Sequence, residues 1–261
     1  RMGQQTPITT SFHLPDGREV IIETGKLATQ ADGSVVVRMG KTMLFCSVVS
    51  AHEPREGQSF FPLSVDYQEK FAAAGKIPGN FFRREARLSD YEILTSRLVD
   101  RAIRPLFPDG YMNDTQVIIN LISGEEDVLP DALAALAASA AMTCSDVPFN
   151  GPISEVRVAR VKGEFKVNPS RSETEEADME FIVAASMDNV MMVEGEAKEC
   201  QEKDLVEAIR TAHEAIKVQC QAQLDLAAKV GDKANSREVE EAEENEELKA
   251  RVESLTKDKV L

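Results

Sequence analysis

The sequence predicts an α+β fold in which a few long helices pack on mixed β-sheets. Two observations carry this prediction. Short runs of β-branched and apolar residues recur along the chain and are separated by glycine-containing turns. Three longer segments instead space their apolar or alanine residues as packed helices do. Runs of strands interspersed with such helices are typical of the α+β class.

The N-terminal part of the chain is predicted to be a succession of strands. Turns are indicated by Asp16-Gly17, Asp32-Gly33 and Gly40, which separate the runs. The run after Gly40 is apolar on both faces in its middle, which is typical of a central strand. The predicted strands are Ser11–Leu14, Glu19–Thr24, Ser34–Met39, Thr42–Ser50 and Phe61–Val65.

A helix is predicted from Ser89 to Ile103. Ser89 suits the N-cap, and Glu92 three residues later completes a capping box. Pro105 ends the helix because proline has no backbone N–H to donate to the preceding turn. The apolar stripe expected to face the core consists of Tyr91, Leu94, Leu98 and Ala102.

The same patterns predict the rest of the chain. A buried strand, an alanine-rich core helix, two hairpins and a long helix ending at Gly231 are expected. These elements are Gln116–Ser123, Pro130–Cys144, Glu155–Val161 with Glu164–Val167, Met179–Ala184 with Val190–Glu194, and Lys198–Val230. The acidic stretch Arg237–Leu261 favours a helix with nothing to pack against, so we expect the sequence to belong to a longer protein.

Composition limits the classes of protein to which the chain can belong. No apolar run approaches the ~20 residues that span a bilayer, and the first residues lack the apolar region of a signal peptide. The four cysteines form no C-x-x-C pair, which favours reduced thiols in the cytoplasm over a zinc site or disulfides. These cysteines are Cys46, Cys144, Cys200 and Cys220.

The formal net charge of −15 argues against nucleic acid unless the basic residues are gathered in one place. Such a region lies between Lys76 and Arg104, where basic residues outnumber acidic ones. Within it, Phe81 and Phe82 adjoin Arg83 and Arg84. Single-stranded nucleic acid is bound by this combination, because bases stack on aromatic rings and guanidinium groups grip phosphates. An equally simple reading places the phenylalanines in the core and the arginines in solvent.

The predicted helix behind this segment carries three more arginines. Arg97, Arg101 and Arg104 are spaced i, i+4 and i+7, so they share one face. An ion pair with Asp100 at i, i+4 is the alternative role for Arg104. We therefore interpret the segment from Phe81 to Arg104 as a surface for single-stranded RNA.

Seven motifs in order resemble the bacterial polynucleotide phosphorylase family. The resemblance covers about Gly3 to Val230, and the motifs together are highly specific. They are FFPLSVDYQE at 60–69, AAGKIPG at 73–79, FFRRE at 81–85, SRLVDR at 96–101, IRPLFP at 103–108, PFNGPI at 148–153 and MVE at 192–194.

This resemblance implies fold, activity and assembly. It implies an RNase PH-like fold, similar to domain 2 of ribosomal protein S5, in a homotrimeric ring whose pore takes single-stranded RNA. The family degrades mRNA from the 3′ end by phosphorolysis, releasing nucleoside diphosphates, with Mg²⁺ or Mn²⁺ and inorganic phosphate. Possible partners are the degradosome's endoribonuclease and RNA helicase, in the cytoplasm and not at a membrane. The implied RNA-binding residues are Phe81, Phe82, Arg83, Arg84, Arg87, Arg97 and Arg101.

The resemblance also implies a division of the chain. Residues 1–145 would be the core of the first RNase PH-like domain with its RNA-binding loop, and 146–230 the C-terminal subdomain of the same unit. Residues 231–261 would begin the helical linker domain that precedes a second RNase PH-like domain.

In the family, chemistry belongs to that second domain, where a serine-rich loop binds phosphate and an Asp…Asp-x-Lys arrangement holds the metal. In this sequence the serine loop aligns with Val128–Asp131, and the second pattern aligns with Thr174, Glu180 and Ile182. Asp131 would repel phosphate, and one carboxylate and the lysine are missing. We therefore expect neither a catalytic site nor a metal site in this chain.

Two other kinds of protein remain open. One is a non-catalytic RNase PH-like ring subunit of an exosome-type assembly, which would bind RNA without a catalytic second half. The other is an acidic protein-interaction module in which Phe81–Arg84 is structural.

Overall fold

The computed structural model describes residues 6–27, 30–69, 89–239 and 251. Its larger sheet has the strand order β1-β2-β3-β4-β6-β5, and every pair is antiparallel except the parallel pair β5 and β6. The mixed sheet of the predicted α+β class is therefore confirmed. Its strands are β1 (Ile8–His13), β2 (Glu19–Thr24), β3 (Gly33–Met39), β4 (Thr42–Ser50), β5 (Leu63–Glu69) and β6 (Thr115–Ser123).

The second sheet is antiparallel and has the order β10-β9-β7-β8. Lys162 and Gly163 join two of its strands and have φ angles of 51° and 82°. Positive φ at both turn residues gives the twist that a two-residue hairpin needs. The strands are β7 (Ile153–Val161), β8 (Glu164–Val167), β9 (Met179–Ser186) and β10 (Val190–Ala197).

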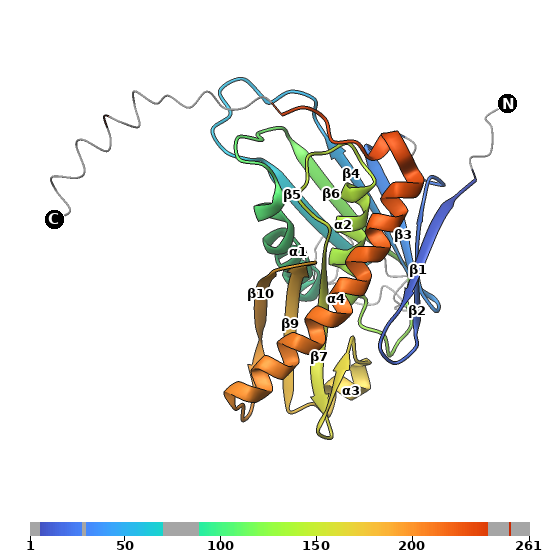
Figure 1. The fold of residues 1–261 in the computed structure, drawn as a ribbon, viewed down its shortest axis with the longest axis vertical. Helices are drawn as coiled ribbons and strands as arrows, with labels where there is room; N and C mark the ends of the chain where they lie inside the picture. The colour runs from blue at the N-terminus through green and yellow to red at the C-terminus, as the bar shows by residue number, and fades with distance from the viewer. Residues whose placement is uncertain (1–5, 28–29, 70–88, 240–250, 252–261) are drawn as a thin grey trace, which may run out of the picture.

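Helix α2 (Ala134–Thr143) lies at the centre of the molecule and contacts β3, β4 and β7. All its residues except Thr143 are buried, and most are alanine. Small side chains let the backbones approach closely: a Cβ added to Gly33 on β3 would lie 2.1 Å from the Ala141 carbonyl oxygen. The alanine-rich sequence therefore places α2 in the core shared by the two sheets (Figure 1).

Helix α4 (Glu202–Val230) packs along β7 and β9 and reaches β1 of the larger sheet (Figure 1). A buried hydrogen-bonded triangle fixes its position. Ser139 Oγ donates to Gln223 Oε1 (2.6 Å), Gln223 Nε2 donates to the Ile153 carbonyl (2.8 Å), and the Ile153 N–H donates to Ser139 Oγ (3.0 Å). Because an unmet buried polar group costs about 1–3 kcal/mol, this triangle sets the register of α4 against α2 and β7.

Helix α1 (Asp90–Ile103) packs on β5 and α2. The predicted capping box is confirmed: the Glu92 N–H donates to Ser89 Oγ, and the Ser89 N–H donates to Glu92 Oε1, each at 3.2 Å. A short 3₁₀ turn, η1 (Arg104–Leu106), follows the helix.

Several predicted boundaries were wrong. β5 begins at Leu63 and continues to Glu69. The segment from Pro130 starts as a 3₁₀ turn, η2 (Pro130–Leu133), before α2. β10 extends to Ala197, so α4 begins at Glu202 and not at Lys198.

Two further differences concern α3 and α1. The short helix α3 (Arg171–Glu175) was not predicted; Ser170 and Glu173 form its capping box. Leu94 is 49% exposed and not in the core, because the buried face of α1 is formed instead by Thr95, Leu98, Val99, Ala102 and Ile103.

After α4, Arg237 connects the chain to the end of β4 in the larger sheet through hydrogen bonds. Its guanidinium donates to the Ser50 and Ala51 carbonyls and to Asp146 Oδ1, at 3.2, 3.1 and 2.6 Å, and its side chain is 11% exposed. Residues 240–250 and 252–261 lie outside the described residues, and so does most of the helix predicted there. No helix in the described part of the chain is both long and apolar enough to cross a membrane.

Candidate nucleic-acid interface

The seven predicted RNA-binding residues fall into two groups. Phe81, Phe82, Arg83, Arg84 and Arg87 lie outside the described residues. Arg97 and Arg101 lie on α1, and both side chains are exposed. Arg87, the last residue of the first group, and Arg97, the first of the second, are ten positions apart in the sequence.

The exposed face of α1 combines apolar and basic side chains. Ile93 is 44% exposed and Leu94 is 49% exposed, and both lie within one turn of Arg97. Arg101 follows one turn later, so these residues share a face. This surface is defined here as the α1 face and consists of Ile93, Leu94, Arg97 and Arg101.

The three arginines of this region differ in their partners. Arg104 is structural: its Nε and Nη2 donate to the two Asp100 carboxylate oxygens at 2.7 Å, and Nη2 also donates to the Leu63 carbonyl at 3.0 Å. These bonds to Asp100 raise the pKa of Arg104. Its guanidinium also lies 6.0 Å from the centre of the Phe61 ring. The predicted Asp100 pair is thus confirmed.

Arg101 and Arg97 are the candidates for contact with a ligand. Arg101 Nη1 donates to Glu194 Oε2 on β10 at 2.7 Å, and both side chains are largely exposed. Among the described residues, none forms a hydrogen bond or ion pair with Arg97. A phosphate that approaches Arg101 would meet the Glu194 carboxylate, and no described acidic side chain is bound to Arg97 in the same way.

Behind α1 lies a largely buried charged cluster that the sequence did not predict. Arg157 on β7 pairs with Asp131 of η2 through one guanidinium nitrogen and with Glu180 of β9 through another. Its own backbone N–H donates to Asn168 Oδ1 at 3.0 Å. The Asp131 N–H donates to the Tyr91 hydroxyl at 3.2 Å, which links the cluster to α1.

Glu155, two residues before Arg157 on β7, belongs to the same cluster and is 5% exposed. Its Oε2 has no hydrogen-bond partner among the described residues. Burial, and then the nearby charge of Asp131, raise the pKa of Glu155 to about 8. The side chain is therefore a neutral acid in the folded chain at neutral pH.

The cluster contains two of the residues that the sequence analysis aligned with the family's phosphate and metal ligands, Asp131 and Glu180. Both carboxylates are bound to Arg157. The residues therefore do not fit a Mg²⁺ ion. Within the ranges that the structure describes, no three His, Cys, Asp or Glu side chains are arranged to hold a metal.

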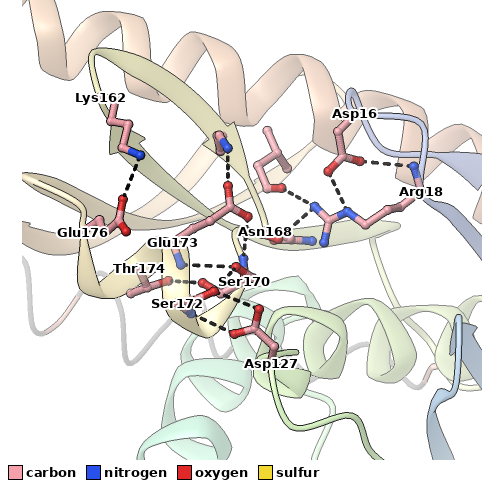
Figure 2. Close-up of polar contacts among 12 residues, drawn as sticks. Asp16, Arg18, Asp127, Lys162, Asn168, Ser170, Ser172, Glu173, Thr174 and Glu176 are labelled. Carbon is pink, nitrogen blue, oxygen red and sulfur yellow. Dashed lines mark hydrogen bonds and ion pairs between the residues drawn. The ribbon is translucent and has the colours of Figure 1, made fainter.

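Thr174 was also aligned with the family's metal-binding pattern. It lies on α3, and its side chain forms a hydrogen bond within the same helical segment (Figure 2). Its hydroxyl donates to the Ser170 carbonyl at 3.0 Å. Asp127 fixes the start of α3, because the Ser172 N–H and hydroxyl donate to its carboxylate at 2.9 and 2.8 Å. These hydrogen bonds lower the pKa of Asp127. The polar groups around α3 thus bind one another (Figure 2).

Glu155 makes the stability of the chain depend on pH. The folded chain retains a proton that the unfolded chain releases above its ordinary pKa, so this contribution is complete at low pH and is lost as the pH rises towards 8. We expect the free energy of unfolding to fall by a few kcal/mol, at ~1.4 kcal/mol per pH unit, across this window. Glu155→Gln should remove this slope in urea unfolding at pH 5, 6, 7 and 8.

The control is Glu196→Gln, which removes one exposed carboxylate from β10. Its pH profile should follow that of the unsubstituted chain. Equal slopes for the Glu155→Gln variant and the unsubstituted chain would contradict the assignment of a buried neutral acid.

Comparisons with known proteins agree with the sequence motifs. The model for domain 1 of the 3′ exoribonuclease family matches residues 16–148, and the model for domain 2 matches residues 151–215. A polyribonucleotide nucleotidyltransferase of Cytophaga hutchinsonii is 61% identical over 226 residues, which are 87% of this chain and 32% of that protein. One of Amoebophilus asiaticus is 57% identical over 253 residues, which are 97% of this chain and 36% of that protein.

This chain therefore spans about a third of the length of these relatives. A solved structure of the Archaeoglobus fulgidus exosome with RNA bound to the active site has a similar chain, with a TM-score of 0.61 and 20% identity. The match covers 78% of this chain and 90% of that one. At this identity the likeness concerns the fold alone, and the two family models, which cover residues 16–148 and 151–215, confirm the predicted RNase PH-like architecture.

Proposed function

This chain belongs to the 3′ exoribonuclease family, and we propose that it is the N-terminal, RNA-binding part of a polynucleotide phosphorylase. The whole protein would degrade single-stranded RNA processively from the 3′ end with inorganic phosphate and release nucleoside diphosphates. This chain would hold and guide the strand, and the phosphorolysis would take place in another part of the protein.

The α1 face is the observation that carries this proposal. Arg97 and Arg101 are exposed on a helix that directly follows the Phe81–Arg87 segment. Guanidinium groups bind phosphate oxygens bidentately, and Ile93 and Leu94 supply apolar area for riboses and bases. Together with Phe81, Phe82, Arg83, Arg84 and Arg87, the residues of the α1 face would form one path for the RNA strand.

The charged cluster around Arg157 supports the proposal that chemistry occurs elsewhere. Phosphoryl transfer needs cations and hydrogen-bond donors aimed at the phosphate. Here the cation of the cluster, Arg157, is largely buried and is bound to Asp131 and Glu180, and Glu155 adds a further acid. Mg²⁺ or Mn²⁺ and phosphate would be bound by a second RNase PH-like domain of the whole protein.

The proposal extends to domains and assembly. Residues 1–145 and 146–230 would be the two parts of one RNase PH-like unit, and residues 231–261 would begin a helical linker. We propose a homotrimeric ring, formed in the cytoplasm, with a degradosome endoribonuclease and an RNA helicase as possible partners.

A non-catalytic ring subunit is the alternative that the Arg157 cluster also favours, because such a subunit needs no phosphate site. The two alternatives differ in what accompanies this chain in the whole protein. A second RNase PH-like domain with the Asp…Asp-x-Lys arrangement would support the enzyme, and its absence would support the subunit.

The RNA path is tested by two double variants of the full-length protein, Arg97→Ala/Arg101→Ala and Arg83→Ala/Arg84→Ala. Each should weaken binding of a single-stranded oligonucleotide roughly tenfold or more, because each charged hydrogen bond contributes about 1.5–3 kcal/mol. Each should also reduce the slope of log K against log salt by about 1.4, since a single-strand phosphate contact contributes about 0.7.

The control is Arg38→Ala/Arg210→Ala, which removes the same charge from exposed positions outside the α1 face. It should leave the affinity and the salt slope nearly unchanged. If the α1 variant binds RNA like this control, then Arg97 and Arg101 do not contact the strand; the same comparison applies separately to Arg83 and Arg84.

A further inference from the structure

Glu194 is an acidic residue that contacts the proposed RNA path at Arg101. It lies on β10, and its Oε2 accepts a hydrogen bond from Arg101 Nη1 at 2.7 Å. The pair joins α1 to β10 through two residues that are 93 positions apart in the sequence. Arg97, one turn earlier on the same helix face, has no such partner among the described residues. The two arginines of the α1 face are therefore not equivalent.

We propose that Glu194 is a built-in counter-charge that occupies Arg101 when RNA is absent and competes with an RNA phosphate for it. This inference rests on the proposed function, since it requires that Arg101 contact RNA. It adds a residue that lowers the affinity of the α1 face for RNA.

The exposure of the pair allows a phosphate to displace the carboxylate. The Arg101 side chain is 60% exposed and that of Glu194 is 45% exposed. An ion pair in such surroundings is weak, because water screens it and two long side chains must be ordered. A phosphate that uses two guanidinium N–H groups forms the stronger, charge-assisted interaction.

The backbone position of Glu194 keeps the carboxylate close after it is displaced. β10 pairs with β9, and Glu194 lies opposite Ile182 in that register. Its negative charge therefore stays near any phosphate bound at Arg101 and repels it. An RNA strand that must move through a pore during processive degradation benefits from such a weakened contact, while Arg97 has no paired carboxylate among the described residues.

The test is a double-mutant cycle in the full-length protein, with affinity for a single-stranded oligonucleotide measured at low salt. Glu194→Gln should raise the affinity about two- to fivefold, the range that exposed ion pairs contribute. In the Arg101→Ala background, Glu194→Gln should have no more effect than Glu196→Gln, because the guanidinium for which the carboxylate competes is gone. Glu196→Gln, two residues along the same strand, is the charge-matched control and should have a smaller effect.

The outcomes separate this inference from the proposed function. If Arg101→Ala leaves the affinity unchanged, the proposed RNA contact at Arg101 is wrong, and the role of Glu194 is wrong with it. If Arg101→Ala weakens binding, the inference alone is overturned by either of two results. In the first, Glu194→Gln acts like Glu196→Gln; in the second, it lowers the affinity, as expected of a residue that merely orients Arg101.

Discussion

Replacing Arg157 with alanine is expected to lower the free energy of unfolding by roughly 3–5 kcal/mol. Arg157 is 14% exposed and is paired with both Asp131 and Glu180. Without it, two carboxylates remain in a poorly hydrated site beside Glu155, which is itself buried. Removing one partner of a buried charge network leaves the others without compensation, and this is among the largest effects that a single substitution has.

Urea unfolding followed by circular dichroism measures this loss. Arg210→Ala is the matched control, because Arg210 pairs with Glu207 on the exposed surface of α4, with side chains that are 68% and 45% exposed. That pair should contribute less than about 1 kcal/mol. A loss for Arg157→Ala as small as that of the control would mean that water solvates the cluster and that it does not stabilise the fold.

Local signals allowed much of the fold to be predicted. The strands Glu19–Thr24 and Thr42–Ser50 have their predicted bounds, because turns flank each of them. The Ser89 capping box and the Lys162-Gly163 turn are decided by residues at most three positions apart. All the residues that determine such a cap or turn are neighbours in the sequence, so no knowledge of distant residues was needed.

Tertiary contacts decided what the sequence did not predict. Leu94 matched a helical stripe, but the orientation of α1 on β5 and α2 buries Val99 and Ile103 instead. α3 has only five residues, too few for a periodic pattern to be seen. Its start is fixed by Asp127, which is 45 residues away from Ser172 along the chain.

In the candidate site, too, local spacing predicted some features and tertiary contacts decided the others. The spacing of Arg97 and Arg101 was enough to place them on one helix face. The partners Glu194 and Asp131 come from other elements, so their roles could not be predicted from spacing. One signal was present in the sequence: Glu155 and Arg157 lie two residues apart in the mostly buried strand β7, which places their charges on the same face of it. The roles of Phe81–Arg84 and Arg87 remain predictions.

Residues 1–261 alone are expected to release no nucleoside diphosphates from single-stranded RNA. The reason is chemical: the aligned phosphate-binding position holds Asp131, and the cation beside it, Arg157, is already bound by two carboxylates. A phosphate ion there would meet acids in place of hydroxyls and free cations, so the developing charge of phosphoryl transfer would not be stabilised. The expected effect is a complete loss of activity relative to the full-length protein.

The most direct test of the whole account is phosphate-dependent nucleoside diphosphate release by residues 1–261. The protein should be prepared from cells that lack phosphorolytic exoribonucleases, shown to be folded by circular dichroism, and assayed with inorganic phosphate and Mg²⁺ or Mn²⁺. The full-length protein is the positive control. We predict release at background level from the folded chain and phosphate-dependent release from the full-length protein. Phosphate-dependent release by residues 1–261 would contradict the claim that this chain holds RNA and leaves the chemistry to another domain.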